Sequence, residues 1–172
     1  MAQLKICGMK VPANIAGIVA LHPDYLGFIF HPASKRFVDD LDAELVCNIP
    51  ASIKTTGVFV DAELNEVKKM VLKYHFNAVQ LHGNESPAYC ASLKGTAEVI
   101  KAFGIDEKFD FNQLKDYEDA VDYFLFDTQT PEHGGSGKTF SWRLLENYTL
   151  QKPYFLSGGI GLEHAAELLK NY

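Results

Sequence analysis

Two side chains that can transfer protons stand at the ends of short apolar runs, far apart in the sequence. Cys7 closes the run Leu4–Cys7, and Asp127 closes the run Tyr123–Asp127. A cysteine there is either a small buried residue or a catalytic thiol. A carboxyl group after an apolar strand is partly desolvated, which suits a general acid, unless it only caps the next turn with Thr128. Residue type alone leaves both alternatives open.

A second set of residues is suited to binding anions. Arg36 is either a solvated surface charge or a guanidinium that binds a carboxylate through two hydrogen bonds. Gly158 and Gly159 follow the run Tyr154–Leu156, and glycines allow backbone N–H groups to approach phosphate oxygens closely. A Gly-Gly turn is a weak signal alone, but its position after the seventh apolar run favours phosphate binding.

The segment His133–Thr139 holds three glycines and a lysine. It is similar to a P-loop, but the first glycine of that motif would fall at position 132, which is Glu132. We interpret the segment as a loop that closes over a ligand, with Gly135 and Gly137 as candidate contacts. His82 and Gly83 stand at the end of the strand expected over Ala78–Leu81 and are also candidate substrate contacts. A single histidine at a strand end is, however, more often structural.

Composition excludes several classes of protein. The net charge is −6 and no Lys/Arg cluster is present, so nucleic acid is not an expected partner and a phosphate must be bound locally. The three cysteines form no CxxC pair, which argues against a zinc site or a redox dithiol and favours a reducing cytoplasm. We find no signal peptide and no run near the ~20 apolar residues that span a bilayer.

Seven apolar runs alternate with amphipathic segments. They are Leu4–Cys7, Tyr25–Phe30, Thr56–Val60, Ala78–Leu81, Val99–Ala102, Tyr123–Asp127 and Tyr154–Leu156. Continuous apolar runs are typical of parallel strands buried on both faces. Helices are predicted over Ala62–Tyr74, with Asp61 as N-cap, and over Leu162–Leu169. We assign Trp142 to packing, and Cys47 and Cys90 to helices that face the core.

Strand–helix alternation predicts one α/β domain over residues 1–172, made of seven βα units. Polar or glycine-rich residues follow five of the seven strands, which favours a TIM-type (β/α)8 barrel over a doubly wound sheet. Such a barrel needs eight strands, and we expect strand 8 and helix 8 to be missing from this chain. We therefore expect a monomer of low stability and activity, or a homodimer in which a second copy covers the gap.

The order of motifs resembles the phosphoribosylanthranilate isomerase family over essentially the whole chain. The resemblance is carried by Lys5–Gly8, Gly27–Phe30 with Ser34–Phe37, Gly57–Val60, Val79–Gly83, Phe126–Thr128, Gly134–Phe140 and Leu156–Gly159. It implies an Amadori rearrangement in tryptophan biosynthesis, with Asp127 as general acid and Cys7 as general base. It also implies that Arg36 holds the anthranilate carboxylate, that Gly158 and Gly159 contact the phosphate, and that no metal or cofactor is needed.

The sequence departs from the family pattern at Lys35, Ser136, Ser141 and Ser157, but none of these changes removes a chemical role. Two other functions compete with this one. The first is a related phosphosugar isomerase with two carboxylates, against which Cys7 speaks. The second is a fragment that keeps the family's sequence but is catalytically inactive.

Overall fold

The computed structural model describes residues 3–129, 139–164 and 168 of the chain. Its elements are, in order, β1 (Lys5–Cys7), α1 (Pro12–Val19), β2 (Tyr25–Ile29), α2 (Ala43–Cys47), β3 (Lys54–Phe59), α3 (Leu64–Tyr74), β4 (Ala78–Leu81), α4 (Pro87–Ala91), β5 (Glu98–Ile105), the 3-10 helix η1 (Phe111–Tyr117), β6 (Tyr123–Thr128), the 3-10 helix η2 (Trp142–Asn147), β7 (Tyr154–Leu156) and the 3-10 helix η3 (Leu162–His164). All seven predicted strands are present, and two of them, Ala78–Leu81 and Tyr154–Leu156, have the predicted bounds.

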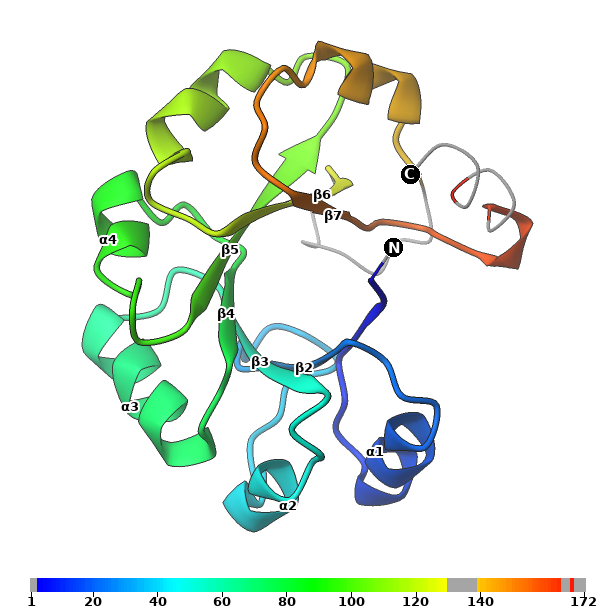
Figure 1. Ribbon diagram of the computed structural model, residues 1–172, viewed down its shortest axis with the longest axis vertical. Coiled ribbons are helices and arrows are strands. Elements are labelled where there is room, and N and C mark those ends of the chain that lie inside the picture. The colour runs from blue at the N-terminus through cyan, green and yellow to red at the C-terminus, as the bar shows by residue number, and fades with distance from the viewer. Residues whose placement is uncertain (1–2, 130–138, 165–167, 169–172) are drawn as a thin grey trace.

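The seven strands form one parallel sheet in the order β1-β2-β3-β4-β5-β6-β7. In Figure 1 the strands curve around an inner space and the helices lie outside them, which is the arrangement expected for a (β/α) barrel. Among the described residues β1 and β7 are the two edges of the sheet. Because all strands run the same way, their carboxyl ends meet at one rim.

Alternate residues of each strand face the inner space and pack on one another. Tyr25, Ala78, Ile100, Ala102 and Leu125 form this inner cluster, and Phe155 packs against it. The intervening residues join the helices in a larger outer core. Burial on both faces explains why the strands read as continuous apolar runs in the sequence.

A polar group closes the inner space at the amino ends of the strands. Tyr25 Oη donates to Glu98 Oε2 over 3.0 Å, and Lys54 Nζ forms an ion pair of 2.5 Å with Glu98 Oε1. Burial, a hydrogen bond with Tyr123 and the charge of Glu98 raise the pKa of Tyr25 far above its ordinary value. These contacts lie at the end opposite to the candidate site, and we assign them to stability.

A buried ion pair holds the opposite rim. Lys101 Nζ lies 3.2 Å from Glu85 Oε2, and both side chains are 2% exposed. The ammonium also donates to the backbone oxygens of Gly83 and Ala102, and Glu85 accepts from the backbone N–H groups of Gly83 and Asp61. The pair therefore ties together the loops that leave β3 and β4 and the body of β5.

Two details differ from the sequence-based predictions. Asp61 does not cap α3, which begins after Glu63; Asp61 takes a left-handed φ of 49°, and its carboxylate accepts from Asn84 N–H over 2.5 Å. Cys47 was predicted in the core but is exposed, because the short helix α2 buries only Val46. Cys90 is buried as predicted.

Two other predicted elements lie near the end of the chain. Trp142 begins η2 and packs edge-on against His164, with ring centroids 5.3 Å apart, which confirms its packing role. The predicted helix Leu162–Leu169 is described only as far as η3 and at Leu168, and its other residues lie outside the described part.

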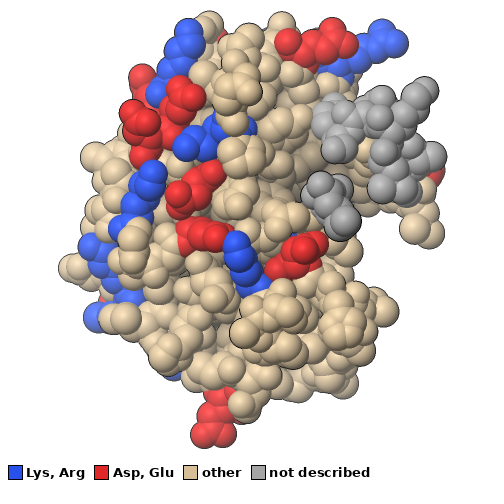
Figure 2. Space-filling model, in the orientation of Figure 1, with Lys and Arg blue, Asp and Glu red and all other residues tan. Residues whose placement is uncertain are grey.

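The surface carries mixed charge. On the face shown in Figure 2, basic and acidic side chains interleave along one side, and no continuous basic area is seen there. Among the residues that the structure describes, no helix has both the length and the apolar character needed to cross a bilayer.

The buried ion pair generates a stability prediction. Replacing Glu85 with alanine should lower the free energy of unfolding by about 3–5 kcal/mol, because the ammonium of Lys101 stays buried without its partner charge. Glu66→Ala, which breaks the exposed pair with Lys69, is the control and should change it by less than about 1 kcal/mol. Urea unfolding followed by circular dichroism measures both; equal values for the two variants would contradict the prediction.

Burial generates a prediction about the thiols. Burial raises the pKa of the Cys90 thiol from 9.0 to about 11. At pH 9 iodoacetamide should therefore modify Cys47 in the folded protein and leave Cys90 intact, as mass spectrometry of the peptides will show. Because the folded state holds this proton more tightly, the associated stability is complete below pH 9 and is lost as the pH rises toward 11. Equal labelling of Cys47 and Cys90 at pH 9 would contradict the predicted protection of Cys90.

Candidate active site

The carboxyl end of β6 places Asp127 at the rim, where it is 7% exposed. Its Oδ1 accepts from the N–H of Thr128 over 2.8 Å, as the turn-capping alternative requires. Its Oδ2 faces another strand and lies 3.5 Å from Nε2 of His82, which follows β4. One oxygen of Asp127 therefore serves the local backbone, while the other is directed across the rim.

The carboxyl end of β1 brings Cys7 next to Arg36. Cys7 is half-buried, and Arg36 Nη1 donates to the Cys7 backbone oxygen over 3.3 Å. Gly8 has a φ of 90°, and a Cβ on it would lie 2.5 Å from Arg36 Cδ, so the arginine side chain lies directly over this glycine. The structure thus places the Arg36 guanidinium at the backbone of Cys7, although the two residues are 29 positions apart in sequence.

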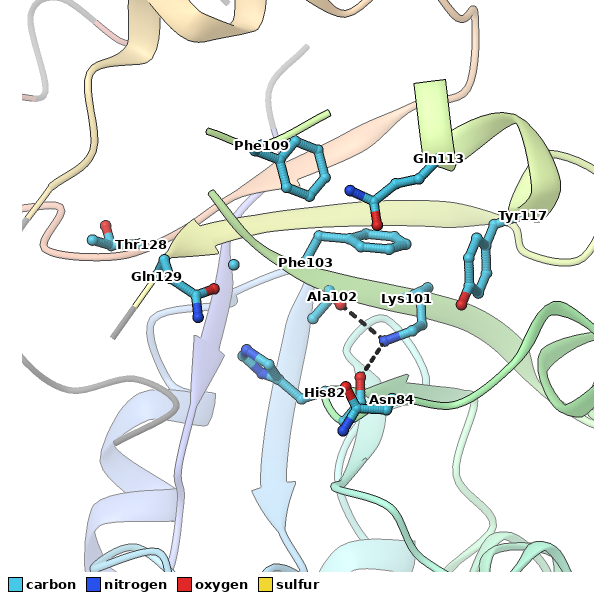
Figure 3. A pocket seen from close by; sticks show the side chains of 12 residues that line it. His82, Asn84, Lys101, Ala102, Phe103, Phe109, Gln113, Tyr117, Thr128 and Gln129 are labelled. Carbon is cyan, nitrogen blue, oxygen red and sulfur yellow. Dashed lines mark hydrogen bonds between the residues drawn. The ribbon is translucent and has the colours of Figure 1, made fainter. Parts of the chain in front are cut away.

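A cavity of about 370 Å³ opens at the rim beside Asp127. Figure 3 shows His82 and Asn84 on one side of it, Phe109 and Gln113 on the other, and Lys101 between them with hydrogen bonds to backbone oxygens. Its lining residues come from the loop after β4, from β5, from the end of β6, and from η1 and the loop before it: His82, Gly83, Asn84, Lys101, Ala102, Phe103, Gly104, Phe109, Gln113, Tyr117, Thr128 and Gln129. Cys7 and Asp127 do not line the cavity, but His82 and Thr128, which both lie against Asp127, do.

The loop after β7 approaches Asp127 closely. Gly158 and Gly159 both have left-handed φ values, 89° and 65°. A Cβ on Gly158 would lie 2.4 Å from Thr128 Oγ1 and 2.6 Å from Asp127 Oδ1, so only glycine fits there. The candidate phosphate loop therefore lies against the candidate acid. Gly135 and Gly137, the predicted contacts of the glycine-rich loop, lie outside the described residues.

Sequence reasoning missed several polar residues of this region. Lys101 lies inside the apolar run Val99–Ala102, and Gln80 lies inside Ala78–Leu81. A polar side chain in a strand buried on both faces must find a partner, so each was a signal of an internal network. Glu85 had no such signal, because it stands in a loop and only the fold brings it to Lys101.

The arrangement is suited to proton transfer on an anionic substrate. A carboxyl group, a thiol and an imidazole come from three strand ends, and a guanidinium bonds to the backbone of the residue that carries the thiol. Within residues 3–129, 139–164 and 168 no group of three or more His, Cys, Asp or Glu side chains is arranged to hold a metal ion.

Comparison with known proteins places the chain in a family. Residues 4–172 match the model of the family described as N-(5'phosphoribosyl)anthranilate (PRA) isomerase. The N-(5'-phosphoribosyl)anthranilate isomerase of Parabacteroides distasonis is 43% identical over 172 residues, which cover 98% of this chain and 77% of the relative.

Solved structures agree with this match. The crystal structure of phosphoribosyl anthranilate isomerase from Thermotoga maritima superposes with a TM-score of 0.85 at 33% identity, covering 99% of this chain and 83% of that one. A second isomerase structure, in complex with reduced 1-(o-carboxyphenylamino)-1-deoxyribulose 5-phosphate, has a TM-score of 0.64 at 25% identity and covers 94% and 90%. The chain therefore belongs to the N-(5'-phosphoribosyl)anthranilate isomerase family.

Proposed function

We propose that this protein converts N-(5'-phosphoribosyl)anthranilate into 1-(o-carboxyphenylamino)-1-deoxyribulose 5-phosphate, an Amadori rearrangement in tryptophan biosynthesis, with Asp127 as general acid and Cys7 as general base. Membership of the family supports the reaction, and the complex of a relative with the reduced product supports the substrate class. The observation that carries the assignment of residues is the guanidinium of Arg36, bonded to the backbone of Cys7.

The substrate has an anionic group at each end, and the site offers a candidate partner for each. Arg36 can bind the anthranilate carboxylate through two hydrogen bonds, which places the aromatic end beside Cys7. Gly158 and Gly159, whose backbone is bare of side chains, are candidates for the phosphate at the other end. His82 and Gly83 line the cavity between β4 and β6, where the ribose hydroxyls can be bound.

The first step opens the furanose ring. Asp127 donates its proton to the ring oxygen, the bond from this oxygen to the first sugar carbon breaks, and the nitrogen lone pair forms a C=N bond. The carboxylate that remains is stabilised at Oδ1 by the N–H of Thr128, which is 2.8 Å away. Since only Oδ1 is used by the adjacent backbone, Oδ2 is the oxygen that can give up the proton.

The second step moves a proton off the second sugar carbon. Cys7, as thiolate, takes this proton; the electron pair forms a C=C bond and the C=N electrons return to nitrogen. The resulting enolamine takes up a proton at the first carbon and loses the proton of its hydroxyl group at the second carbon, which gives the ketone. Cys7 then releases the proton that it gained and Asp127 takes one up, so substrate and product are isomers and the reaction balances without an oxidant or reductant.

The assignment of acid and base predicts matched losses of turnover. Cys7→Ala and Asp127→Asn should each lower kcat by about 10²–10⁴-fold, because each removes one proton-transfer group. The KM should change little, because neither side chain binds the carboxylate or the phosphate of the substrate. The decay of anthranilate fluorescence in purified protein measures both constants.

Cys47→Ala is the matched control for this experiment, because it removes an exposed thiol in α2. It should keep the wild-type kcat. If either site variant turns over at the wild-type rate, its residue is not the acid or the base.

The carboxylate contact predicts a different pattern for Arg36. Arg36→Met should mainly raise the KM, because the carboxylate is bound equally in the substrate and in the transition state. A loss of about 10-fold or more in kcat/KM corresponds to one charge-assisted hydrogen bond. Arg143→Met, at an exposed position in η2, is the control and should leave KM unchanged. An unaltered KM in the Arg36 variant would exclude the contact.

A further inference from the structure

A row of polar side chains crosses the inner space of the sheet and ends at Asp127. Lys5 Nζ donates to Gln80 Oε1 over 2.8 Å, and Gln80 Nε2 lies 2.9 Å from His82 Nδ1. His82 Nε2 in turn lies 3.5 Å from Asp127 Oδ2. The row therefore connects β1, β4 and β6, and its central amide, on Gln80, is only 4% exposed.

The chemistry of Lys5 fixes the direction of every hydrogen bond in this row. An ammonium group can only donate, so the Gln80 atom that faces it must be the carbonyl oxygen. The NH2 group of Gln80 then faces His82, and it too can only donate. His82 Nδ1 must accept, which leaves the hydrogen of the neutral ring on Nε2, the nitrogen that faces Asp127.

Gly27 makes room for the beginning of the row. A Cβ at this position would lie 3.1 Å from Lys5 Nζ and 2.8 Å from Cys7 Sγ. Because β2 presents no side chain here, the lysine can turn into the inner space instead of reaching the solvent. The ammonium is half-buried there, where a hydrogen bond orients its partner more strongly than it would in water.

We propose that Lys5 and Gln80 are positioning residues, which hold His82 with its hydrogen on Nε2 and direct this N–H at the carboxyl group of Asp127. The proposal rests on the proposed function, in which Asp127 becomes a carboxylate as the ring opens. Thr128 N–H stabilises Oδ1, and His82 supplies the second donor, at Oδ2. A donor already aimed at the site of developing charge stabilises the transition state without further reorganisation.

The tautomer of His82 is directly measurable and can be reversed by one isosteric change. In ¹⁵N–¹H correlation spectra of the wild-type protein, the ring of His82 should be protonated at Nε2 and not at Nδ1. Gln80→Glu keeps the contact with Lys5 but can only accept, so it should move the hydrogen to Nδ1. Lys5→Met, which leaves the Gln80 amide free to turn over, should give a mixture of both forms.

Thr56→Val is the matched control, because it removes a buried hydroxyl of the adjacent strand β3 that bonds to no described residue. It should keep the wild-type tautomer and turnover. A wild-type His82 protonated at Nδ1, or an unchanged tautomer in folded Gln80→Glu, would overturn the proposal. The thermal midpoint of each variant shows whether it is folded.

Kinetics add the functional half of the test. Gln80→Glu should lower kcat about 10- to 100-fold, the effect of one hydrogen bond to a charged group, with the KM within about threefold of wild type. Lys5→Met should lower kcat less, because part of its population keeps the wild-type tautomer. Full turnover in a variant whose tautomer has reversed would overturn the positioning role. If the wild-type protein shows no isomerisation but its His82 tautomer still reverses in Gln80→Glu, the proposed function is wrong and the orientation of His82 is supported.

Discussion

The ion pair between Lys101 and Glu85 is the interaction on which the geometry of the rim depends. Its two charges come from β5 and from the loop after β4, and its outer hydrogen bonds reach the backbone of Gly83 and of Asp61, after β3. Buried charges are tolerated only where partners satisfy them, so these loops cannot move independently without exposing a charge. His82 leaves β4 immediately before Gly83, and its position relative to β6 is therefore set by a pair that has no part in proton transfer.

The second constraint is the alternation of the strands. A strand turns successive side chains to opposite faces. Once one residue of a strand faces the inner space, its two neighbours must face the helices. The apolar cluster around Ile100 and Leu125 fills part of the inner face. Gln80, which pairs in register with Ile100, carries the polar row from Lys5 past this cluster to the rim.

The positions of the strands could be predicted from the sequence because burial on both faces leaves an uninterrupted apolar run, as in Ala78–Leu81. Their full lengths could not, because β5 continues to Ile105 through pairing with β6, which is a tertiary contact. Asp61 was misjudged for a similar reason. Its carboxylate could cap a helix, but in the structure it accepts a hydrogen bond from the N–H group of Asn84 on the neighbouring loop instead. Cys7, Arg36 and Asp127 could be proposed from the sequence because each stands at or after a strand end. Lys5 and Glu85 could not, because their partners are brought near only by folding.

The missing side chain at Gly158 couples two parts of the rim mechanically. The backbone of the loop after β7 lies directly against the Asp127 carboxyl group, with no flexible atoms between them to absorb a displacement. A shift of this loop toward β6 would therefore displace Asp127 or Thr128. The loop and the carboxyl group are therefore expected to move together. A ligand that fixes the loop after β7 would also restrict the orientation of the Asp127 carboxyl group.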